Sequence, residues 1–276
     1  IRSADRPDRS PLIVAGGTCT YNPEPLAPFV DVISLGEGED ALPELIQLYR
    51  KAKAEGWSKD RMLWETAKLP GFYVPSLYRV SYQEDGTVAA ITPEEGVPAV
   101  VTKRLVKEMD KSYYPVKTIV PSTEVTHDRV MLELFRGCIR GCRFCQAGFV
   151  YRPVRNRSHE LLAQQGVEAC KDSGYQEMTL MSLSSSDYPD LLPLCDGLLE
   201  WCPPNKVNLS LPSLRADNFS MNLMEKLQAG GRKSGLTFAP EAGSQRLRDA
   251  INKNVTEEDL LNSCRTAFAG GWSSVK

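Results

Sequence analysis

Three cysteines within one short segment constrain this chain more than any other feature. Cys138, Cys142 and Cys145 are spaced C-x3-C-x2-C in the stretch FRGCIRGCRFCQAGF, residues 135–149. An apolar run, residues 129–137, leads directly into this stretch. Thiolates this close in sequence can bind one compact inorganic group, so the sequence predicts a loop that folds around a metal centre.

The number of cysteines discriminates between kinds of metal centre. A structural zinc site normally has four ligands arranged as two pairs. Here the fourth would have to be His127, His159 or Cys170, and none lies at the spacing of a zinc finger. A 4Fe–4S cluster has four irons, so three cysteines leave one iron open to bind another molecule. The cluster is favoured, with a zinc site and three buried thiols as the alternatives.

The composition is that of a soluble protein. The 276 residues are 42% hydrophobic and have a formal net charge of −2, which gives no sign of a nucleic-acid or membrane partner for the whole chain. No apolar run approaches the roughly 20 residues that cross a bilayer. Five of the eight cysteines are scattered, unlike a disulfide framework. We expect a cytoplasmic protein with reduced thiols and, since the chain opens on Ile1, a longer full-length protein.

Short apolar runs and helical patterns alternate along much of the chain, which predicts an α/β fold with parallel strands. Near the start, the runs at 11–17 and 30–40 precede a helix with Leu42, Leu45, Ile46 and Tyr49 on one face. Alternating residues around Asp85–Gly86 predict a hairpin.

After residue 125 strands and helices alternate, with a helix from Ser158 to Gly174, another over 220–231, a fourth strand in 233–244 and a capping box at Thr256 and Asp259. We predict three parts, 1–70, 71–125 and 126–276, the last ending as its fifth strand begins. The cysteine loop then lies at the carboxyl ends of the strands, where α/β proteins place their chemistry.

The cysteine spacing, with Phe144 before the last cysteine and the loop placed after the first strand of a βα series, resembles the radical SAM superfamily. The resemblance implies a 4Fe–4S cluster on Cys138, Cys142 and Cys145 whose open iron is chelated by S-adenosylmethionine (SAM). Reductive cleavage of SAM would then start radical chemistry. The implied fold is a partial (β/α) radical SAM barrel preceded by the end of a Rossmann-like cobalamin-binding-type domain.

Further residues are assigned through the same resemblance. Ser185 and Asp187 follow the second strand, where the family usually has a Gly-Gly-Glu stretch that receives the SAM amine. The segment FAPEAGSQRLRDAINK, residues 238–253, is similar to a motif of the methylthiotransferase-like branch. It would place Glu241 and Ser244, with Phe144, near SAM. The alternative is that Ser244 caps a helix and Glu241 is merely exposed.

The start of the chain is similar to the end of a cobalamin-binding-like domain. The residues that carry the likeness are AGGTCTYNPEPL followed by VDVISLGEGED. Gly16 and Gly17 would let the backbone approach a ligand, or would only form a tight turn. Cobalamin is therefore open as a ligand, although the histidine loop that binds cobalt in some relatives would lie upstream.

Six arginines crowd the residues around the cysteines: Arg136, Arg140, Arg143, Arg152, Arg155 and Arg157. Cations beside an anionic cluster stabilise it and raise its reduction potential. Alternatively, arginines that alternate with Phe149 and Tyr151 contact the phosphates of RNA.

These observations predict a radical SAM enzyme with SAM and a reductant protein, such as a flavodoxin or ferredoxin, as partners. The substrate is unknown; RNA methylation or thiolation is one outcome that the resemblance allows. The alternative is a non-catalytic RNA-binding module stabilised by zinc or a cluster.

Cluster ligation can be tested by substitution. Changing Cys138, Cys142 or Cys145 to alanine is expected to abolish the sulfide-to-iron absorbance after anoxic reconstitution, because each cysteine holds one iron. The control, Cys170→Ala, should retain it. Loss of the cluster from the Cys170 variant would reveal a fourth protein ligand and contradict the open iron.

Overall fold

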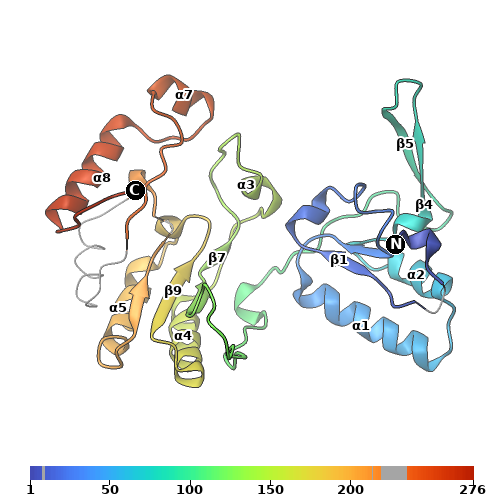
Figure 1. Ribbon diagram of the computed structural model, residues 1–276, viewed down its shortest axis with the longest axis horizontal. Helices are drawn as coiled ribbons and strands as arrows, with labels where there is room; N and C mark the ends of the chain where they lie inside the picture. Colours follow the sequence, from blue (N-terminus) through green and yellow to red (C-terminus); the bar gives the residue numbers. More distant parts are fainter. Residues whose placement is uncertain (8–9, 213, 219–234) are drawn as a thin grey trace. The chain divides into compact units, whose positions relative to one another are not determined.

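The computed structural model describes residues 1–7, 10–212, 214–218 and 235–276. The chain divides into two compact units, Ile1–Lys107 and Glu108–Lys276 (Figure 1). The helix predicted over 220–231 and the first residues of the strand predicted in 233–244 lie outside the described residues. No helix in the described part is long and apolar enough to cross a membrane.

Unit 1 contains a small three-stranded sheet. Strand β1 (Val14–Gly16) pairs in parallel with β2 (Val32–Ser34), and β3 (Phe72–Tyr73) pairs antiparallel with β2. Two helices, α1 (Gly38–Ala54) and α2 (Lys59–Ala67), follow β2 in the chain. Both strands predicted for this region are therefore present and parallel, as expected of the end of a Rossmann-like domain.

The buried face of α1 differs from the prediction. Ala41, Leu45 and Ala52 are buried, whereas Leu42 is 51% and Ile46 43% exposed. The small alanine side chains allow the helix to approach its neighbours closely, so the buried stripe is shifted from the larger side chains. The prediction of a buried side chain was right for Leu45 and wrong for Leu42 and Ile46.

A separate hairpin completes unit 1. Strands β4 (Tyr78–Tyr82) and β5 (Val88–Pro93) pair only with each other. Gly86 has φ +82°, and Asp85 Oδ1 accepts a hydrogen bond of 2.9 Å from the Thr87 N–H. The hairpin predicted at Asp85–Gly86 is confirmed, because a left-handed glycine suits so tight a turn.

Unit 2 contains a parallel sheet of three strands in the order β10-β9-β6. These are β6 (Val130–Glu133), β9 (Glu177–Met181) and β10 (Asn208–Ser210). Helix α4 (His159–Ser173) lies in the chain between β6 and β9, and α5 (Leu191–Trp201) between β9 and β10. The alternation of strand and helix is confirmed, and the sheet is open.

Shorter elements surround this sheet. Strands β7 (Phe135–Arg136) and β8 (Arg155–Asn156) form an antiparallel pair around α3 (Ala147–Val150). Helices α7 (Gln245–Ala250) and α8 (Glu257–Ala269) come last. The fourth and fifth predicted strands appear as a single parallel bridge between Leu236 and Val275.

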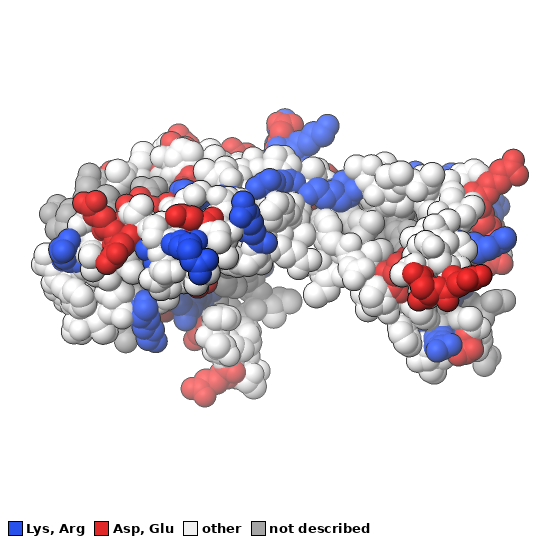
Figure 2. Space-filling model, turned by 90° about the horizontal axis from the view of Figure 1, so that it is seen from above, with Lys and Arg blue, Asp and Glu red and all other residues white. Residues whose placement is uncertain are grey.

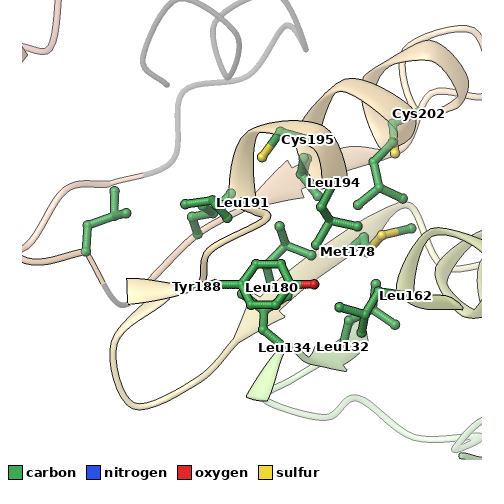
Figure 3. Packing of buried hydrophobic residues seen from close by; sticks show 14 of the residues in the cluster. Leu132, Leu134, Leu162, Met178, Leu180, Tyr188, Leu191, Leu194, Cys195 and Cys202 are labelled. Carbon is green, nitrogen blue, oxygen red and sulfur yellow. The ribbon is translucent and has the colours of Figure 1, made fainter. Parts of the chain in front are cut away.

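The core of unit 2 lies between the sheet and its helices (Figure 3). Leu132 and Leu180 are fully buried, as are Leu162 on α4 and Leu194 on α5. On α4, a Cβ at Gly166 would stand 2.9 Å from Leu132 Cδ1, so a larger residue would push side chains of the sheet away from the helix. The packing fixes the sheet, and the sheet fixes where the strands end.

The helix ends follow the predicted signals. Gly174 ends α4 with φ +74°, and its N–H donates to Cys170 O. Thr256 and Asp259 form a reciprocal capping box at the start of α8. Ser158 occupies the N-cap position of α4 but makes no capping hydrogen bond with its side chain.

The sheet-to-helix core predicts the cost of truncating one strand residue. Leu132→Ala should lower the free energy of unfolding by about 2–5 kcal/mol, because it removes fully buried methyl groups and leaves a cavity. Its neighbour Met131 is 42% exposed, so Met131→Ala should cost less than about 1 kcal/mol. Urea unfolding followed by circular dichroism measures both; equal losses would contradict the assignment of the buried face.

Candidate functional site

The cysteine loop, residues 137–146, lies between β7 and α3. Cys138 and Cys145 are partly exposed, Cys142 is buried, and all three thiols are free. Gly137 starts the loop with φ +99°, and a Cβ there would stand 2.7 Å from Tyr151 O and 2.8 Å from Pro153 O. The two ends of the loop region therefore approach so closely that only glycine fits at this position.

The donor set of this loop suits an iron–sulfur cluster. The Arg140 N–H points to the Cys138 sulfur at 3.4 Å, a contact that stabilises a thiolate. The Cys145 N–H donates to Cys142 O at 3.1 Å, which closes a tight turn between these two ligands. Three free thiols in one loop are the donor set that a 4Fe–4S cluster with one open iron requires.

Arg140 joins the cysteine loop to both neighbouring strands. Its Nε and Nη2 donate to the two Asp187 oxygens at 2.9 and 2.5 Å, and its Nη1 donates to Asp217 Oδ2 at 3.2 Å. Asp187 lies in the short helix η5 (Ser185–Asp187) after β9, and Asp217 in η6 (Ala216–Asn218) after β10. One guanidinium thereby holds the loop to the carboxyl ends of two parallel strands.

These charges stabilise one another. Burial of the Asp187 carboxyl opposes its ionisation, but the hydrogen bonds from Arg140 and Ser184 and the charges of Arg140 and Arg215 together outweigh the burial, so the pKa of Asp187 is lowered. The same contact raises the pKa of Arg140. The Asp187 side chain is only 8% exposed, so the pair is little screened by water.

The residues predicted to follow the second strand have protein partners. Ser185 is fully buried, and its hydroxyl lies 3.1 Å from Ser182 Oγ and 3.4 Å from Leu180 O. Both Asp187 oxygens are bound by Arg140. A contact of either side chain with SAM stays a prediction.

Two other predicted residues are brought together. Lys253 Nζ lies 3.2 Å from Glu241 Oε1 and 5.9 Å from the centre of the Phe144 ring. Glu241 and Phe144, separated by almost 100 positions, thus contact the same cation. Ser244 caps α7 by accepting from the Leu247 N–H at 3.4 Å, the role that the alternative interpretation gave it.

The arginines around the loop bind protein groups. Arg136 donates to both Glu133 oxygens at 2.9 Å, and the buried Arg157 donates to Met109 O at 2.5 Å. Backbone carbonyls accept from the other three: Arg143 to Ala250 O, Arg152 to Arg140 O and Arg155 to Pro153 O. On the face shown in Figure 2, basic side chains are interspersed with acidic ones. The arrangement favours the structural interpretation of the arginines over RNA contact.

A cavity of about 470 Å³ lies where β6 and β9 end, beside Gly137. This volume is in the range of small-molecule sites. Its lining combines the Glu133–Arg136 ion pair with apolar side chains, and includes Phe135, Tyr151, Met181, Ser182 and Leu183. No local sequence pattern marks this lining, because its residues come from separate segments.

In unit 1 the carboxyl ends of the parallel strands β1 and β2 are partly covered by the chain. The Arg104 carbonyl oxygen lies 2.2 Å from where a Cβ of Gly36 would stand, and Glu37 Oε2 accepts from the Val106 N–H at 2.6 Å. The chain itself therefore covers the end of β2. Around Gly17, which has φ +99°, a Cβ would meet no atom of the described residues within 4 Å, so among these residues none covers that end of β1.

Comparison with protein families decides the affiliation. The family described as "Radical SAM superfamily" matches residues 132–276, which include the whole cysteine loop. The chain belongs to the radical SAM superfamily. A second family, "Radical SAM proteins, N-terminal", matches residues 1–75. Membership implies a 4Fe–4S cluster and SAM as cofactors.

Two proteins of Methanocaldococcus jannaschii are similar over almost the whole chain. The uncharacterized protein MJ0966 is 31% identical over 96% of this chain and 50% of its own length. A second, MJ0865, whose name assigns it provisionally to the methylthiotransferases, is 22% identical over 95% of this chain and 51% of its own length. This chain thus spans about half the length of these relatives.

Solved structures show the same fold. The radical SAM methyltransferase TsrM from Kitasatospora setae, with tryptophan substrate and a SAM analogue bound, matches 94% of this chain and 48% of its own with a TM-score of 0.57 at 16% identity. A TsrM structure with cobalamin and a [4Fe-4S] cluster gives 0.61 at 15% identity, over 94% of this chain and 49% of that one. The expected fold, a partial radical SAM barrel after a cobalamin-binding-type domain, is confirmed.

The Arg140–Asp187 pair predicts a pH-dependent stability. Asp187→Asn should lower the free energy of unfolding by about 1–3 kcal/mol at pH 7, because the partly buried Arg140 guanidinium loses a charged acceptor. Since folding lowers the pKa of Asp187, the stabilisation is complete above the unfolded value of about 3.9 and is lost as pH falls through the folded pKa.

The difference between the unaltered protein and Asp187→Asn should therefore shrink below about pH 4 in urea unfolding. Glu241→Gln, which breaks a pair whose carboxylate is 37% exposed, is the control and should cost no more than about 1 kcal/mol. A difference for Asp187→Asn that stays constant down to pH 3 would contradict the ion pair.

Proposed function

We propose that this chain is the cluster-binding part of a radical SAM enzyme. Cys138, Cys142 and Cys145 would hold a 4Fe–4S cluster. With SAM bound at its open iron, the reduced cluster would supply the electron that cleaves SAM to methionine and a 5′-deoxyadenosyl radical. The observation that carries the proposal is one loop with three free cysteines, attached by Arg140 to the ends of two parallel strands.

Protein side chains position the loop and the ligand. The cysteine loop is held against the sheet by the ion pairs of Arg140 with Asp187 and Asp217. In this arrangement Asp187 supports the cluster site indirectly, through Arg140. Phe144 and Glu241 both contact Lys253 and are the SAM contacts that the arrangement supports best. The cavity at the ends of β6 and β9 receives a small polar ligand or the group of a substrate that reacts.

We infer group transfer, methylation or thiolation, as the reaction class. One relative is named for methylthio transfer and the similar solved structures are of a methyltransferase. RNA is retained as a substrate class from the resemblance, but the arginines around the loop bind protein groups and do not add to it. A flavodoxin or ferredoxin in the cytoplasm would supply the electron.

Cobalamin would belong to unit 1. The open carboxyl end of β1, at Gly16–Gly17, is where a Rossmann-type sheet receives a ligand. The neighbouring end of β2 is covered by Arg104. This chain would therefore supply one side of a cobalamin site.

The alternative, a zinc-stabilised module, has weaker support. Zinc ligands must converge on one ion at about 2.3 Å or less. No three His, Cys, Asp or Glu side chains do so in the ranges that the structure describes. A 4Fe–4S cluster distributes its cysteines over different irons, so its ligands need not meet at one point.

One preparation tests the proposal against this alternative. The protein, reconstituted without oxygen and reduced with dithionite, should contain four irons and four sulfides per chain and convert SAM to 5′-deoxyadenosine. Cys142→Ala should produce none, and Cys264→Ala should match the unaltered protein. One equivalent of zinc, no iron and no deoxyadenosine would instead establish the zinc-stabilised module.

A further inference from the structure

The turn Ala250–Lys253, which follows α7, contacts the cysteine loop through three hydrogen bonds. Asn252 Nδ2 donates to Gly141 O at 2.8 Å. The Arg143 N–H donates to Ile251 O at 2.9 Å, and Arg143 Nη1 donates to Ala250 O at 2.5 Å. A segment more than 100 residues further along the chain thus binds the backbone between two of the cysteines.

Asn252 is adapted to this contact. It has φ +55°, the left-handed conformation that asparagine tolerates better than most residues. A Cβ on Gly141 would stand 2.8 Å from Asn252 Nδ2, so a larger residue at this position would force the Asn252 side chain to shift. Asn252 and Gly141 are therefore in direct contact where the turn packs against the cysteine loop.

The turn is itself tied to the Arg140 network. Arg215 Nη2 donates to Lys253 O at 3.1 Å, and Arg215 Nε donates to Asp217 Oδ1 at 2.8 Å. Asp217 in turn accepts from Arg140. The backbone from Arg140 to Arg143 is therefore held at both ends by one continuous set of hydrogen bonds.

The Asn252 contact also fixes a peptide plane. The Gly141 carbonyl and the Cys142 N–H belong to the same trans peptide group, so they point in opposite directions. With the carbonyl bound by Asn252, the Cys142 N–H is turned to the other side. Within the described ranges this N–H has no protein acceptor.

We propose that Asn252 is a positioning residue of the cluster: by binding the Gly141 carbonyl, it directs the Cys142 N–H to a cluster sulfur. The inference rests on the proposed function, because it needs the cluster. Hydrogen bonds to the sulfurs raise the reduction potential of an iron–sulfur cluster. Asn252 thereby makes one-electron reduction of the cluster, by the same reductant, easier.

Substitutions at Asn252 test this role without measuring turnover. Asn252→Asp keeps the shape of the side chain but replaces the donor by an oxygen that repels the carbonyl. Asn252→Gly removes the donor, adds no charge and keeps the left-handed backbone. Asn254→Asp is the matched control, because Asn254 has φ +52° two positions later and receives the same added charge. Gly141→Ala disturbs the contact from the other side.

The readouts are iron and sulfide content, melting temperature, and the reduction potential from titration followed by electron paramagnetic resonance. Both Asn252 variants and Gly141→Ala should have a more negative potential than Asn254→Asp and the unaltered protein, or lose the cluster at an unchanged melting temperature. Full clusters with equal potentials in all proteins would overturn the inference and leave the proposed function standing. No cluster in the unaltered protein would overturn both.

Discussion

The ion pairs of Arg140 are the interaction on which the cluster site depends. A loop rich in glycine and cysteine has few side chains to pack, so it cannot hold its own shape by burial. Arg140 compensates by binding two carboxylates that the sheet places at neighbouring strand ends. Strands β9 and β10 position both carboxylates. The packed core that contains Leu132 and Leu180 therefore holds the cysteine loop in place through Arg140.

The same interaction explains how an anionic cofactor can be held in a protein of slight negative charge. The net charge of the chain is −2, yet the cysteine loop carries Arg140 and Arg143 between its ligands. The Arg140 guanidinium is bound by carboxylates and that of Arg143 by a carbonyl, which keeps both beside the loop. Cations beside three thiolates favour an anionic cluster.

The sequence allowed prediction of whatever depends on local pattern. The parallel strands, the hairpin at Asp85–Gly86, the capping box of α8 and the three cysteines follow from periodicity, turn residues and spacing. Contacts between distant segments could not be predicted from the sequence. Asp217 and Asn252 are 77 and 111 positions from their partners in the loop, and no local pattern marks either residue.

Residue type alone does not distinguish between the roles that one side chain can have. Leu42 on α1 has the expected spacing for burial but is exposed, because alanines on the adjacent face pack closer. Ser244 was predicted either to lie near SAM or to cap a helix; it caps α7 by accepting from the Leu247 N–H, and the SAM contact stays a prediction. The arginines near the cysteines matched an RNA surface by composition, whereas their partners are carbonyls and carboxylates.

The central claim is that three cysteines leave one iron of the cluster open for SAM. Electron paramagnetic resonance of the reduced, reconstituted protein, recorded with and without SAM labelled with nitrogen-15 at its amino group, tests this directly. The account predicts that SAM shifts the g-values and that the label couples to the cluster spin. A spectrum unchanged by saturating SAM would show that the fourth iron is already occupied, and would contradict the account.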